Sequence, residues 1–269
     1  MKKKLLAIYV FFTSFGFDPL KMFQALRGIP SFLKDFIKLK NQSRLLPQKD
    51  FKFGKIHPCL SDRFANSGSG SGHYFHQDLL IATRIFKNNP LKHIDVGSRI
   101  DGFVAHVAAF RAIEVVDIRP LNNTIKNIYF RQADLMKELP MEFVDSCDSL
   151  SCLHALEHFG LGRYGDPINW EGYKLGFDNL CSMLKPGGKF FFSVPIGPQR
   201  IEFNAHRVFS IHFLLNMFKD KFIVDEFSYV DDIGNLHENV SIEDNLSDSN
   251  FGCSFGCGIF CLTKLNTSI

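Results

Sequence analysis

The chain has 269 residues, of which 45% are hydrophobic and 22% charged, as is typical of a folded soluble protein with one large domain and an appendage. The net charge of +3 is too small for a polycation and gives no indication of a nucleic-acid partner. Seven Cys, an odd number with no disulfide-like framework, indicate reduced thiols in a cytoplasmic protein.

The N-terminal stretch combines a basic start with an apolar run from Leu5 to Phe17. The run is shorter than the roughly 20 residues that span a bilayer, and Asp18-Pro19 follows where a signal peptide has small residues. Three interpretations stay open: a buried first strand or helix, a helix lying on the inner face of the membrane, and a cleaved signal. Residues 18–45 predict one or two short amphipathic helices, broken near Gly28-Ile29-Pro30.

The stretch NSGSGSG, residues 66–72, predicts a flexible loop. We therefore expect two parts: residues 1–66, an N-terminal helical segment that is a candidate for membrane association, and residues 67–269, the main domain. The main domain is expected to open with a helix over HYFHQDLLIATRIFK.

From residue 93 the sequence alternates between short apolar strands and helices. The expected strands are HIDV, AIEVVDI, NIYFRQADL, part of FVDSCDSLSCL, KFFFSVP, KFIVDEFSYV and CGIFCLTK. Helices are expected from about Ile100 to Arg111, over NWEGYKLGFDNLCSML, and from Val208 within RVFSIHFLLNMF, with a polar loop at 231–250. This order predicts an α/β fold: a doubly wound, seven-stranded, mostly parallel sheet that binds ligands at the carboxyl ends of its strands.

The stretch HIDVGSRIDGF departs from both familiar phosphate-binding loops. A dinucleotide loop reads G-x-G-x-x-G, but Arg99 occupies the position of the middle glycine. A P-loop needs Lys and Ser or Thr where Phe103-Val104 stand. What remains is an acid, Asp95, before Gly97, which suits a cationic amine, and Asp117 at the end of the next strand, which suits a ribose diol. S-adenosylmethionine has both groups and no phosphate.

At this point the chain resembles a known class. The stretches IDVGSRIDG, EVVDI, QADL and MLKPGGKFFFSVP resemble the successive motifs of class I S-adenosylmethionine-dependent methyltransferases, over about residues 72–264. The resemblance implies a Rossmann-like methyltransferase fold with S-adenosylmethionine as cofactor. Asp117 then binds the ribose hydroxyls, and Asp134 with Leu135 lies at the adenine edge. The full set of implied cofactor-binding residues is Tyr74, Gln77, Asp95, Gly97, Ser98, Gly102, Asp117, Ile118, Asp134 and Leu135.

A narrower resemblance covers nearly the whole chain. The stretches GFDPLKMFQALRGIPSFLKD, HYFHQDL, LHALEHFGLGRYGDP, FNAHRVFS and GCGIF are similar to an uncharacterised methyltransferase-like domain family met in bacterial surface-polysaccharide gene clusters. It supports the enzyme class and brings no established substrate.

Two polar clusters are candidates for the catalytic base, and histidine is the usual base near neutral pH. His154, Glu157 and His158 follow the fourth strand; they are expected to act on the acceptor, or else only to cap and orient the loop. His206 follows the fifth strand and is the second candidate base.

Beside His206, Asn204 and Arg207 are candidates for substrate binding, with Arg207 on an anionic group such as a sugar-nucleotide phosphate. In the alternative, Asn204 and His206 cap the helix that starts at Val208.

A metal site is the minor alternative at two places. One set is His154, His158 and Asp166. The other is Cys253, Cys257 and Cys261, evenly spaced by four, although no C-x-x-C and no neighbouring His accompany them.

These observations predict a methyltransferase that O-methylates a sugar or sugar-nucleotide in surface-glycan synthesis, with the acceptor resting on family analogy alone. N- and carboxyl-methylation stay open. The alternative from another class is a non-catalytic scaffold with a methyltransferase-like fold, docked at the membrane in glycan assembly. A nicotinamide-dependent oxidoreductase is disfavoured by Arg99.

Overall fold

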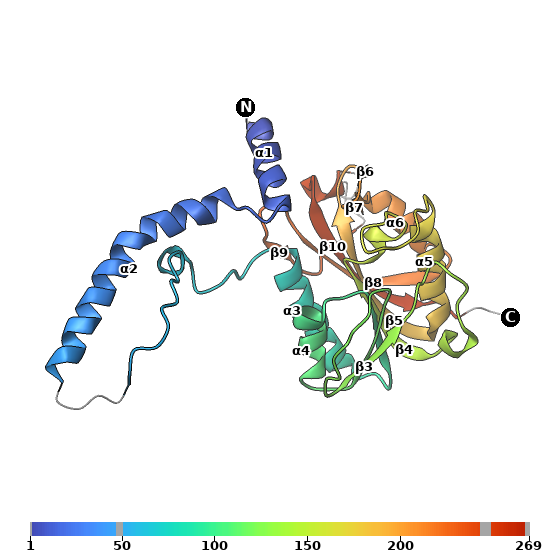
Figure 1. Ribbon diagram of the computed structural model, residues 1–269. Helices are drawn as coiled ribbons and strands as arrows, with labels where there is room; N and C mark the ends of the chain where they lie inside the picture. Colours follow the sequence, from blue (N-terminus) through green and yellow to red (C-terminus); the bar gives the residue numbers. More distant parts are fainter. Residues whose placement is uncertain (1, 47–50, 243–248, 267–269) are drawn as a thin grey trace. The chain divides into compact units, whose positions relative to one another are not determined.

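The computed structural model describes residues 2–46, 51–242 and 249–266, and the chain divides into two units, Met1–Ser69 and Gly70–Ile269 (Figure 1). We describe each unit by itself.

The N-terminal unit holds two helices, α1 (Lys2–Ser14) and α2 (Pro19–Leu45), and a short 3-10 turn, η1 (Asp62–Phe64). The side chain of Asp18 caps α2 by accepting hydrogen bonds from the backbone N–H groups of Leu20 and Lys21. The expected break at Pro30 is wrong, because α2 runs through Pro30 without ending. A proline inside a helix removes one backbone hydrogen bond, and the long helical runs on both sides of Pro30 compensate for that loss.

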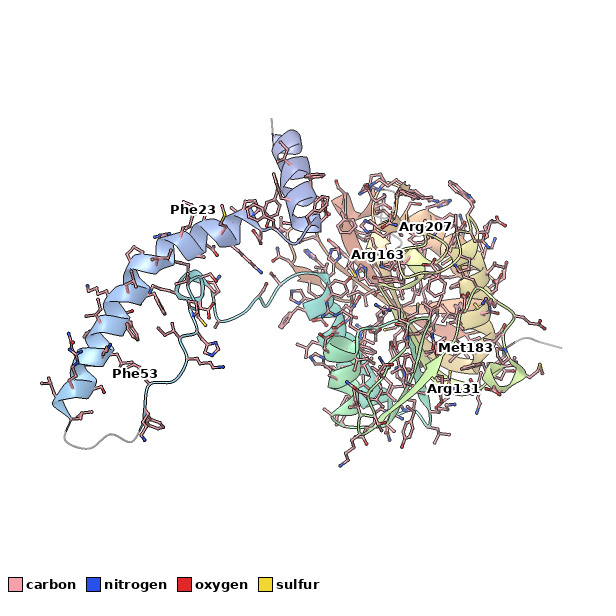
Figure 2. All side chains as sticks on the ribbon, viewed as in Figure 1. Phe23, Phe53, Arg131, Arg163, Met183 and Arg207 are labelled. Atoms are coloured by element: carbon pink, nitrogen blue, oxygen red, sulfur yellow. The ribbon has the colours of Figure 1, made fainter. Side chains whose placement is uncertain are left out.

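The N-terminal unit has no closed core among its described residues. Figure 2 shows its side chains, with Phe23 and Phe53 labelled, standing on helices and an extended segment. Only Gly28 of α2 is buried, where the backbone of Leu60 comes so close that a Cβ atom would lie 1.9 Å from the Leu60 carbonyl oxygen. None of the helices in the described part of the chain has the length and hydropathy of a membrane-spanning segment.

The second unit is built on a mixed sheet in the order β3-β2-β1-β4-β5-β10-β8-β9. Its strands are β1 (His93–Val96), β2 (Ile113–Asp117), β3 (Ile128–Gln132), β4 (Cys147–Leu153), β5 (Leu184–Ile196), β8 (Phe222–Val230), β9 (Leu236–His237) and β10 (Gly256–Lys264). The pairs from β3 to β5 are parallel, and β10 runs antiparallel to both of its neighbours. The predicted doubly wound α/β sheet is confirmed, with one strand more than expected: β9 lies in the stretch predicted as a polar loop.

Helices cover both faces of the sheet. On one face, α3 (His73–Asn88), the π-helical turn η2 (Ile100–Val104) and α4 (Ala105–Ala108) bury one apolar cluster. On the other face, α5 (Gly172–Met183) and α6 (Ile211–Phe218) bury a second cluster rich in Phe. In place of the single helix expected from Ile100 to Arg111, the structure has η2 followed directly by α4, which ends at Ala108, and Gly102 inside η2 departs from helical geometry. Short 3-10 turns complete the unit: η3 (Met141–Phe143), η4 (Leu156–His158) and η5 (Asn250–Gly252).

A small hairpin was missed by the sequence patterns. Strands β6 (Arg200–Glu202) and β7 (His206–Val208) pair antiparallel outside the main sheet. The helix expected to start at Val208 begins at Ile211, and its cap is Ser210, whose hydroxyl accepts from the Phe213 N–H. The interpretation of Asn204 and His206 as helix caps is therefore wrong.

Candidate functional site

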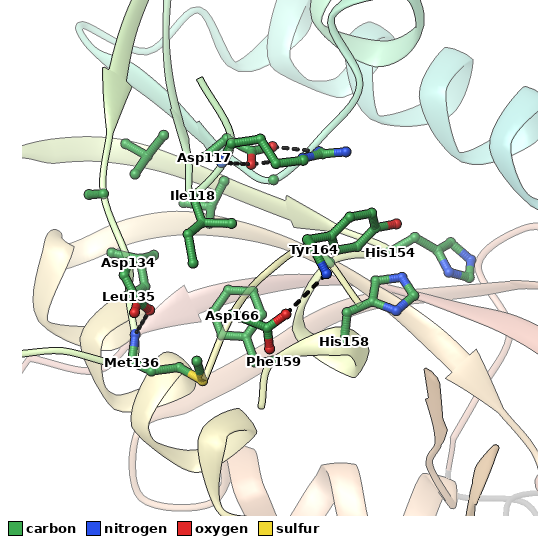
Figure 3. Close-up of a pocket in the computed structure, with 16 residues that line it drawn as sticks. Asp117, Ile118, Asp134, Leu135, Met136, His154, His158, Phe159, Tyr164 and Asp166 are labelled. Atoms are coloured by element: carbon green, nitrogen blue, oxygen red, sulfur yellow. Dashed lines mark hydrogen bonds and ion pairs between the residues drawn. The ribbon is translucent and has the colours of Figure 1, made fainter. Parts of the chain in front are cut away.

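A cavity lies at the carboxyl ends of β1 to β4 (Figure 3). The chain runs outward from β1 to β2 and β3 and then crosses back to β4 on the other side of β1, and open α/β sheets bind ligands at such a switch point. The lining residues are Val96, Gly97, Val116, Asp117, Ile118, Arg119, Ala133, Asp134, Leu135, Met136, His154, Ala155, His158, Phe159, Tyr164 and Asp166.

The turn after β1 is shaped by Gly97. Its φ of +79° is in the left-handed region, and a Cβ atom would lie 2.7 Å from the Cβ of Ala155. Its N–H donates to the Val116 carbonyl and so ties the turn to β2. Glycine therefore keeps this wall of the cavity open.

Asp95 stabilises this turn from inside the protein. Its fully buried carboxylate accepts hydrogen bonds from the N–H and hydroxyl of Ser98 and from the hydroxyl of Ser151. Burial raises the pKa of Asp95 to about 7, although these hydrogen bonds oppose the shift. Asp95, Ser98 and Gly102 do not line the cavity, so the expectation that Asp95 meets a ligand amine is not supported by its position.

Arg99, which occupies the position of the middle glycine in the dinucleotide pattern, pairs with Asp101. Its guanidinium pairs with the carboxylate of Asp101 through two hydrogen bonds, of 3.0 and 2.7 Å, and both side chains are largely exposed. Arg99 is not among the residues that line the cavity.

Asp117 stands at the end of β2 as predicted. Oδ1 accepts from the N–H and the Nε of Arg119, at 2.8 and 3.0 Å, and Oδ2 accepts from Arg119 Nη2 at 2.6 Å. The Arg119 guanidinium also lies over the ring of Tyr164. Oδ2 accepts only this hydrogen bond from the described residues and retains a lone pair for a ligand hydroxyl. Arg119 and Tyr164 were missed by the sequence patterns.

Asp134, Leu135 and Met136 form the far wall, beyond the end of β3. Asp134 Oδ1 accepts from the Met136 N–H, and Leu135 is buried (Figure 3). Ile118, between β2 and β3, adds a further apolar side chain. Two carboxylates, Asp117 and Asp134, thus flank an otherwise mostly apolar slot.

His154 and Glu157 form a buried pair at the end of β4. His154 has a φ of +50°, unusual for a residue with a side chain, and its Nδ1 lies 2.7 Å from Glu157 Oε1. Burial disfavours the charged form of His154, but Cys257 and Glu157 beside it outweigh burial and raise its pKa well above 6.5. Burial likewise opposes the charge on Glu157, and His154 beside it nevertheless lowers the Glu157 pKa.

His158 is held differently. Its Nδ1 lies 2.6 Å from the carbonyl oxygen of Ala205, which can only accept, so the proton sits on Nδ1 and the lone pair on Nε2. Burial lowers the pKa of His158, partly opposed by Glu157. The lowered pKa favours the neutral form of His158 near pH 7, and the residue lines the cavity.

The second predicted cluster, His206, Asn204 and Arg207, does not form a single site. His206 on β7 is half-buried, with its ring 6.5 Å from that of His158, and its pKa is lowered, chiefly by burial. Asn204 is exposed at the turn of the hairpin, with a φ of +60°. Neither residue lines the cavity.

Arg207 does not bind an anion. It is buried, and its guanidinium donates to the carbonyl oxygens of Glu157, Phe159 and Trp170. The prediction of Arg207 as a substrate-binding residue is corrected by these contacts: the side chain ties the hairpin to the loop after β4.

Tyr74 and Gln77 come from α3. The Tyr74 ring lies 5.2 Å from the ring of His154, at the rim of the site, and burial raises its pKa. Gln77 is buried, with Oε1 accepting from the Ser193 hydroxyl and Nε2 donating to Asp78. Gln77 therefore holds the buried side chains of Ser193 and Asp78 in place through hydrogen bonds.

The two expected metal sets are not assembled. Asp166 Oδ2 accepts from the N–H groups of Gly160 and Gly162, so it organises a loop. Cys253 belongs to one apolar cluster, and Cys257 and Cys261 belong to the other. Within residues 2–46, 51–242 and 249–266, the one group with metal-binding geometry is a different set, His73, His154 and Cys257.

Comparisons with known proteins fit the fold. A family model described as "Caenorhabditis protein of unknown function, DUF268" matches residues 107–247. No curated protein matches the sequence.

Among solved structures, the [4+2]-cyclase SpnF is similar over 77% of this chain and 83% of its own, with 13% identity and a TM-score of 0.50. A chain from the complex of the Haloferax volcanii Trm112 methyltransferase activator with its methyltransferase candidate is similar over 73% of this chain and 92% of its own, with 14% identity and a TM-score of 0.50. The N-methyltransferase NodS from Bradyrhizobium japonicum, in complex with S-adenosyl-L-homocysteine, is 12% identical over 72% of this chain and 89% of its own, with a TM-score of 0.48. The likenesses to SpnF and to the Haloferax volcanii chain, each with a TM-score of 0.50, show a shared fold, and the reaction must be argued from the site.

Proposed function

The chain belongs to the family described as Caenorhabditis protein of unknown function, DUF268, and from its cavity we propose that it is an S-adenosylmethionine-dependent methyltransferase. One observation carries the proposal: Asp117 and Asp134, at the ends of adjacent strands, flank a mostly apolar slot whose third wall is opened by Gly97. A nucleoside fits this arrangement, because hydroxyls and an exocyclic amine are donors and carboxylates accept.

The residues present fit the cofactor. Asp117 would hold the ribose hydroxyls, Asp134 the adenine amine, and Leu135 with Ile118 the adenine faces. Gly97 leaves room for the chain that connects ribose to sulfur. When bound, the cofactor supplies an electrophilic methyl group on a cationic sulfur. No glycine-rich phosphate cradle stands at this turn, which disfavours a dinucleotide.

His158 is the base in this proposal. His158 lines the cavity, and because its Nδ1 keeps a proton for the Ala205 carbonyl oxygen, its Nε2, 3.7 Å from Glu157 Oε1, would carry the lone pair. It would take the proton from an acceptor hydroxyl as the oxygen attacks the methyl carbon. His206, whose ring centroid lies 6.5 Å from that of His158, would contact the acceptor in this proposal.

A sugar or sugar-nucleotide in surface-glycan synthesis is the acceptor that we propose. The hairpin β6–β7 borders a second groove, which the residues Trp170 and Tyr173 also line. Trp170 is 76% exposed, and flat apolar rings of this kind bind the C–H faces of sugars. The groove lies beside Arg207, which links it to the loop that carries His158.

The acceptor is tested with the full chain, radiolabelled S-adenosylmethionine and a panel of sugar-nucleotides, with amine and carboxylate acceptors in parallel. We expect label on a sugar hydroxyl, and a KM for that sugar raised about tenfold in Trp170→Ala at unchanged affinity for S-adenosylhomocysteine. Transfer only to an amine or a carboxylate would overturn the sugar assignment and leave the cofactor assignment standing.

We further propose that the N-terminal unit docks on an anionic membrane surface. Residues 1–69 contain 13 Lys and Arg against 4 Asp and no Glu, so this unit is basic while the rest of the chain is acidic. Large apolar side chains such as Phe11, Phe15 and Phe23 are exposed on α1 and α2. Basic and apolar side chains on interfacial helices bind anionic lipid headgroups and the acyl boundary beneath them. This surface equally supports the alternative of a membrane-docked scaffold.

Vesicle sedimentation measures this docking. The full chain should bind vesicles containing phosphatidylglycerol and release from them at high salt. Lys38→Glu with Lys40→Glu should weaken binding about tenfold or more, since each basic residue contributes roughly 1 kcal/mol at an anionic surface. Lys185→Glu with Lys219→Glu makes the same charge change in the second unit and should have little effect. Equal effects from the two pairs would contradict docking through the N-terminal unit.

A further inference from the structure

Three side chains with metal-binding atoms meet at the rim of the cavity. His73 is the first residue of α3, His154 follows β4, and Cys257 is the second residue of β10. One ligand atom from each lies within 4.8 Å of the others. None of these positions is close to another in the sequence, so the fold alone brings them together.

His154 presents a nitrogen without a partner. Its Nδ1 is paired with Glu157 Oε1, while its Nε2 is buried and has no hydrogen-bond partner. The whole residue is only 8% exposed, and a buried polar atom without a partner is costly.

The backbone holds His154 in this orientation. Its φ of +50° is sterically unfavourable for a residue with a side chain, and its N–H donates to the carbonyl oxygen and the hydroxyl of Ser193. Strain of this kind persists where the surrounding structure enforces it, which is common at binding sites.

His73 and Cys257 complete the group. The His73 ring lies parallel to the His154 ring at a centroid distance of 5.2 Å and 15° between planes. The thiol of Cys257 is fully buried, and its contacts with Gln77 Oε1 and with the Gly258 carbonyl oxygen are both 3.9 Å long. Neither contact is a strong hydrogen bond, so the sulfur is available for another partner.

We propose that His73, His154 and Cys257 bind one transition-metal dication of the zinc class. Two imidazole nitrogens and one thiolate are the donor set that favours Zn²⁺ over Mg²⁺ or Ca²⁺. Ligand atoms around a tetrahedral zinc are separated by roughly 3.5 Å, so a small rotation of these side chains closes the set. On binding, the Cys257 thiol and the His154 imidazolium Nε2 each release a proton to solvent, and the sulfur and that nitrogen each donate an electron pair to the metal.

Glu157 is the supporting residue of this site. A carboxylate on the second nitrogen of a metal-bound histidine fixes its tautomer and orientation, and Glu157 Oε1 holds His154 Nδ1 in this way. Glu157 positions His154 and is not itself a ligand.

The site has three protein ligands and an open fourth position. Because His154 also lines the cavity, a metal held by this group would lie beside the space where the acceptor would bind. Three protein ligands with one open position are typical of zinc sites that bind a substrate or water. Metal binding goes beyond the proposed function and does not depend on it; a role on the acceptor rests on the methyltransferase proposal.

Cobalt(II) binding to the full chain, stripped of metal with chelator, tests the site. One equivalent of Co²⁺ should give the near-ultraviolet charge-transfer band of a thiolate bound to cobalt, and Zn²⁺ should displace it. Cys257→Ser should abolish the band, and His73→Gln should weaken Co²⁺ binding at least tenfold. Cys261→Ser is the matched control, since Cys261 is buried on the same strand and the same face.

These measurements distinguish failure of the metal site from failure of the cofactor site. No band in the wild type, a band that survives in Cys257→Ser, or a band lost in Cys261→Ser or in a variant of the exposed Cys59 would overturn the proposal. Thermal unfolding of each variant shows that it is folded. Binding of S-adenosylhomocysteine, measured on the same samples, reports the cofactor cavity separately, so failure of one assignment is distinguished from failure of the other.

Discussion

His158→Gln is expected to lower the kcat of methyl transfer to a hydroxyl acceptor by about 10² to 10⁴-fold, the usual contribution of a general base. The affinity for S-adenosylhomocysteine should stay unchanged, because the product of the cofactor carries no acceptor proton. Gln retains a donor for the Ala205 carbonyl and so preserves the local packing. The measurement is kcat on the sugar acceptor identified in the labelled-methyl assay.

The role of His158 as the base also predicts how activity changes with pH. Burial lowers the pKa of His158 below its ordinary 6.5, and only the neutral form can accept a proton. Activity should therefore be fully present above pH 6.5 and fall as pH decreases through the lowered pKa. His212→Gln, on the exposed side of α6, is the control and should keep both rate and profile. Full turnover in His158→Gln, or an unchanged acid limb, would show that another residue is the base.

Gly97→Ala is expected to weaken S-adenosylhomocysteine binding by at least tenfold and to lower the free energy of unfolding by about 2 to 3 kcal/mol. An alanine at a φ of +79° costs about 1 to 2 kcal/mol in backbone strain, and its Cβ would lie 2.7 Å from the Cβ of Ala155. Relief of that contact moves the turn after β1 relative to β4 and so deforms the cavity. Calorimetry gives the affinity, and denaturant unfolding gives the stability.

Two further variants separate strain from steric contact. Gly252 has a similar φ, +74°, and open space around it, so Gly252→Ala should carry the backbone cost and keep cofactor affinity. The double variant Gly97→Ala with Ala155→Gly removes the contact and should recover part of the affinity. Equal affinities in Gly97→Ala and Gly252→Ala would contradict a cavity wall formed by Gly97.

The sequence predicted the sheet well because its strands are short apolar runs with clear ends. HIDV is β1 with the predicted bounds, and Asp117 and Asp134 stand at the strand ends where the order of the motifs placed them. Parallel strands put their carboxyl ends at one edge, so the location of the cavity followed from the order of elements alone.

The remaining features depend on tertiary contacts that one-dimensional patterns do not contain. The hairpin β6–β7 has strands of three residues, too short to show alternation. The sequence predicted that Arg207 binds an anionic group of the substrate. Only the fold shows that its guanidinium donates to three backbone carbonyl oxygens. His73, His154 and Cys257 are separated by 81 and 103 residues, so no spacing signals their meeting.

Calorimetric titration of the full chain with S-adenosylhomocysteine tests the central claim most directly, with NAD⁺ titrated in parallel. The account predicts micromolar binding of S-adenosylhomocysteine, a loss of about 100-fold in Asp117→Ala, unchanged affinity in the exposed Asp178→Ala, and no binding of NAD⁺. The loss corresponds to removing the carboxylate that accepts from the ribose hydroxyls. A folded wild type that binds no S-adenosylhomocysteine, or that binds NAD⁺ instead, would contradict the methyltransferase assignment; the first result would favour the membrane-docked scaffold.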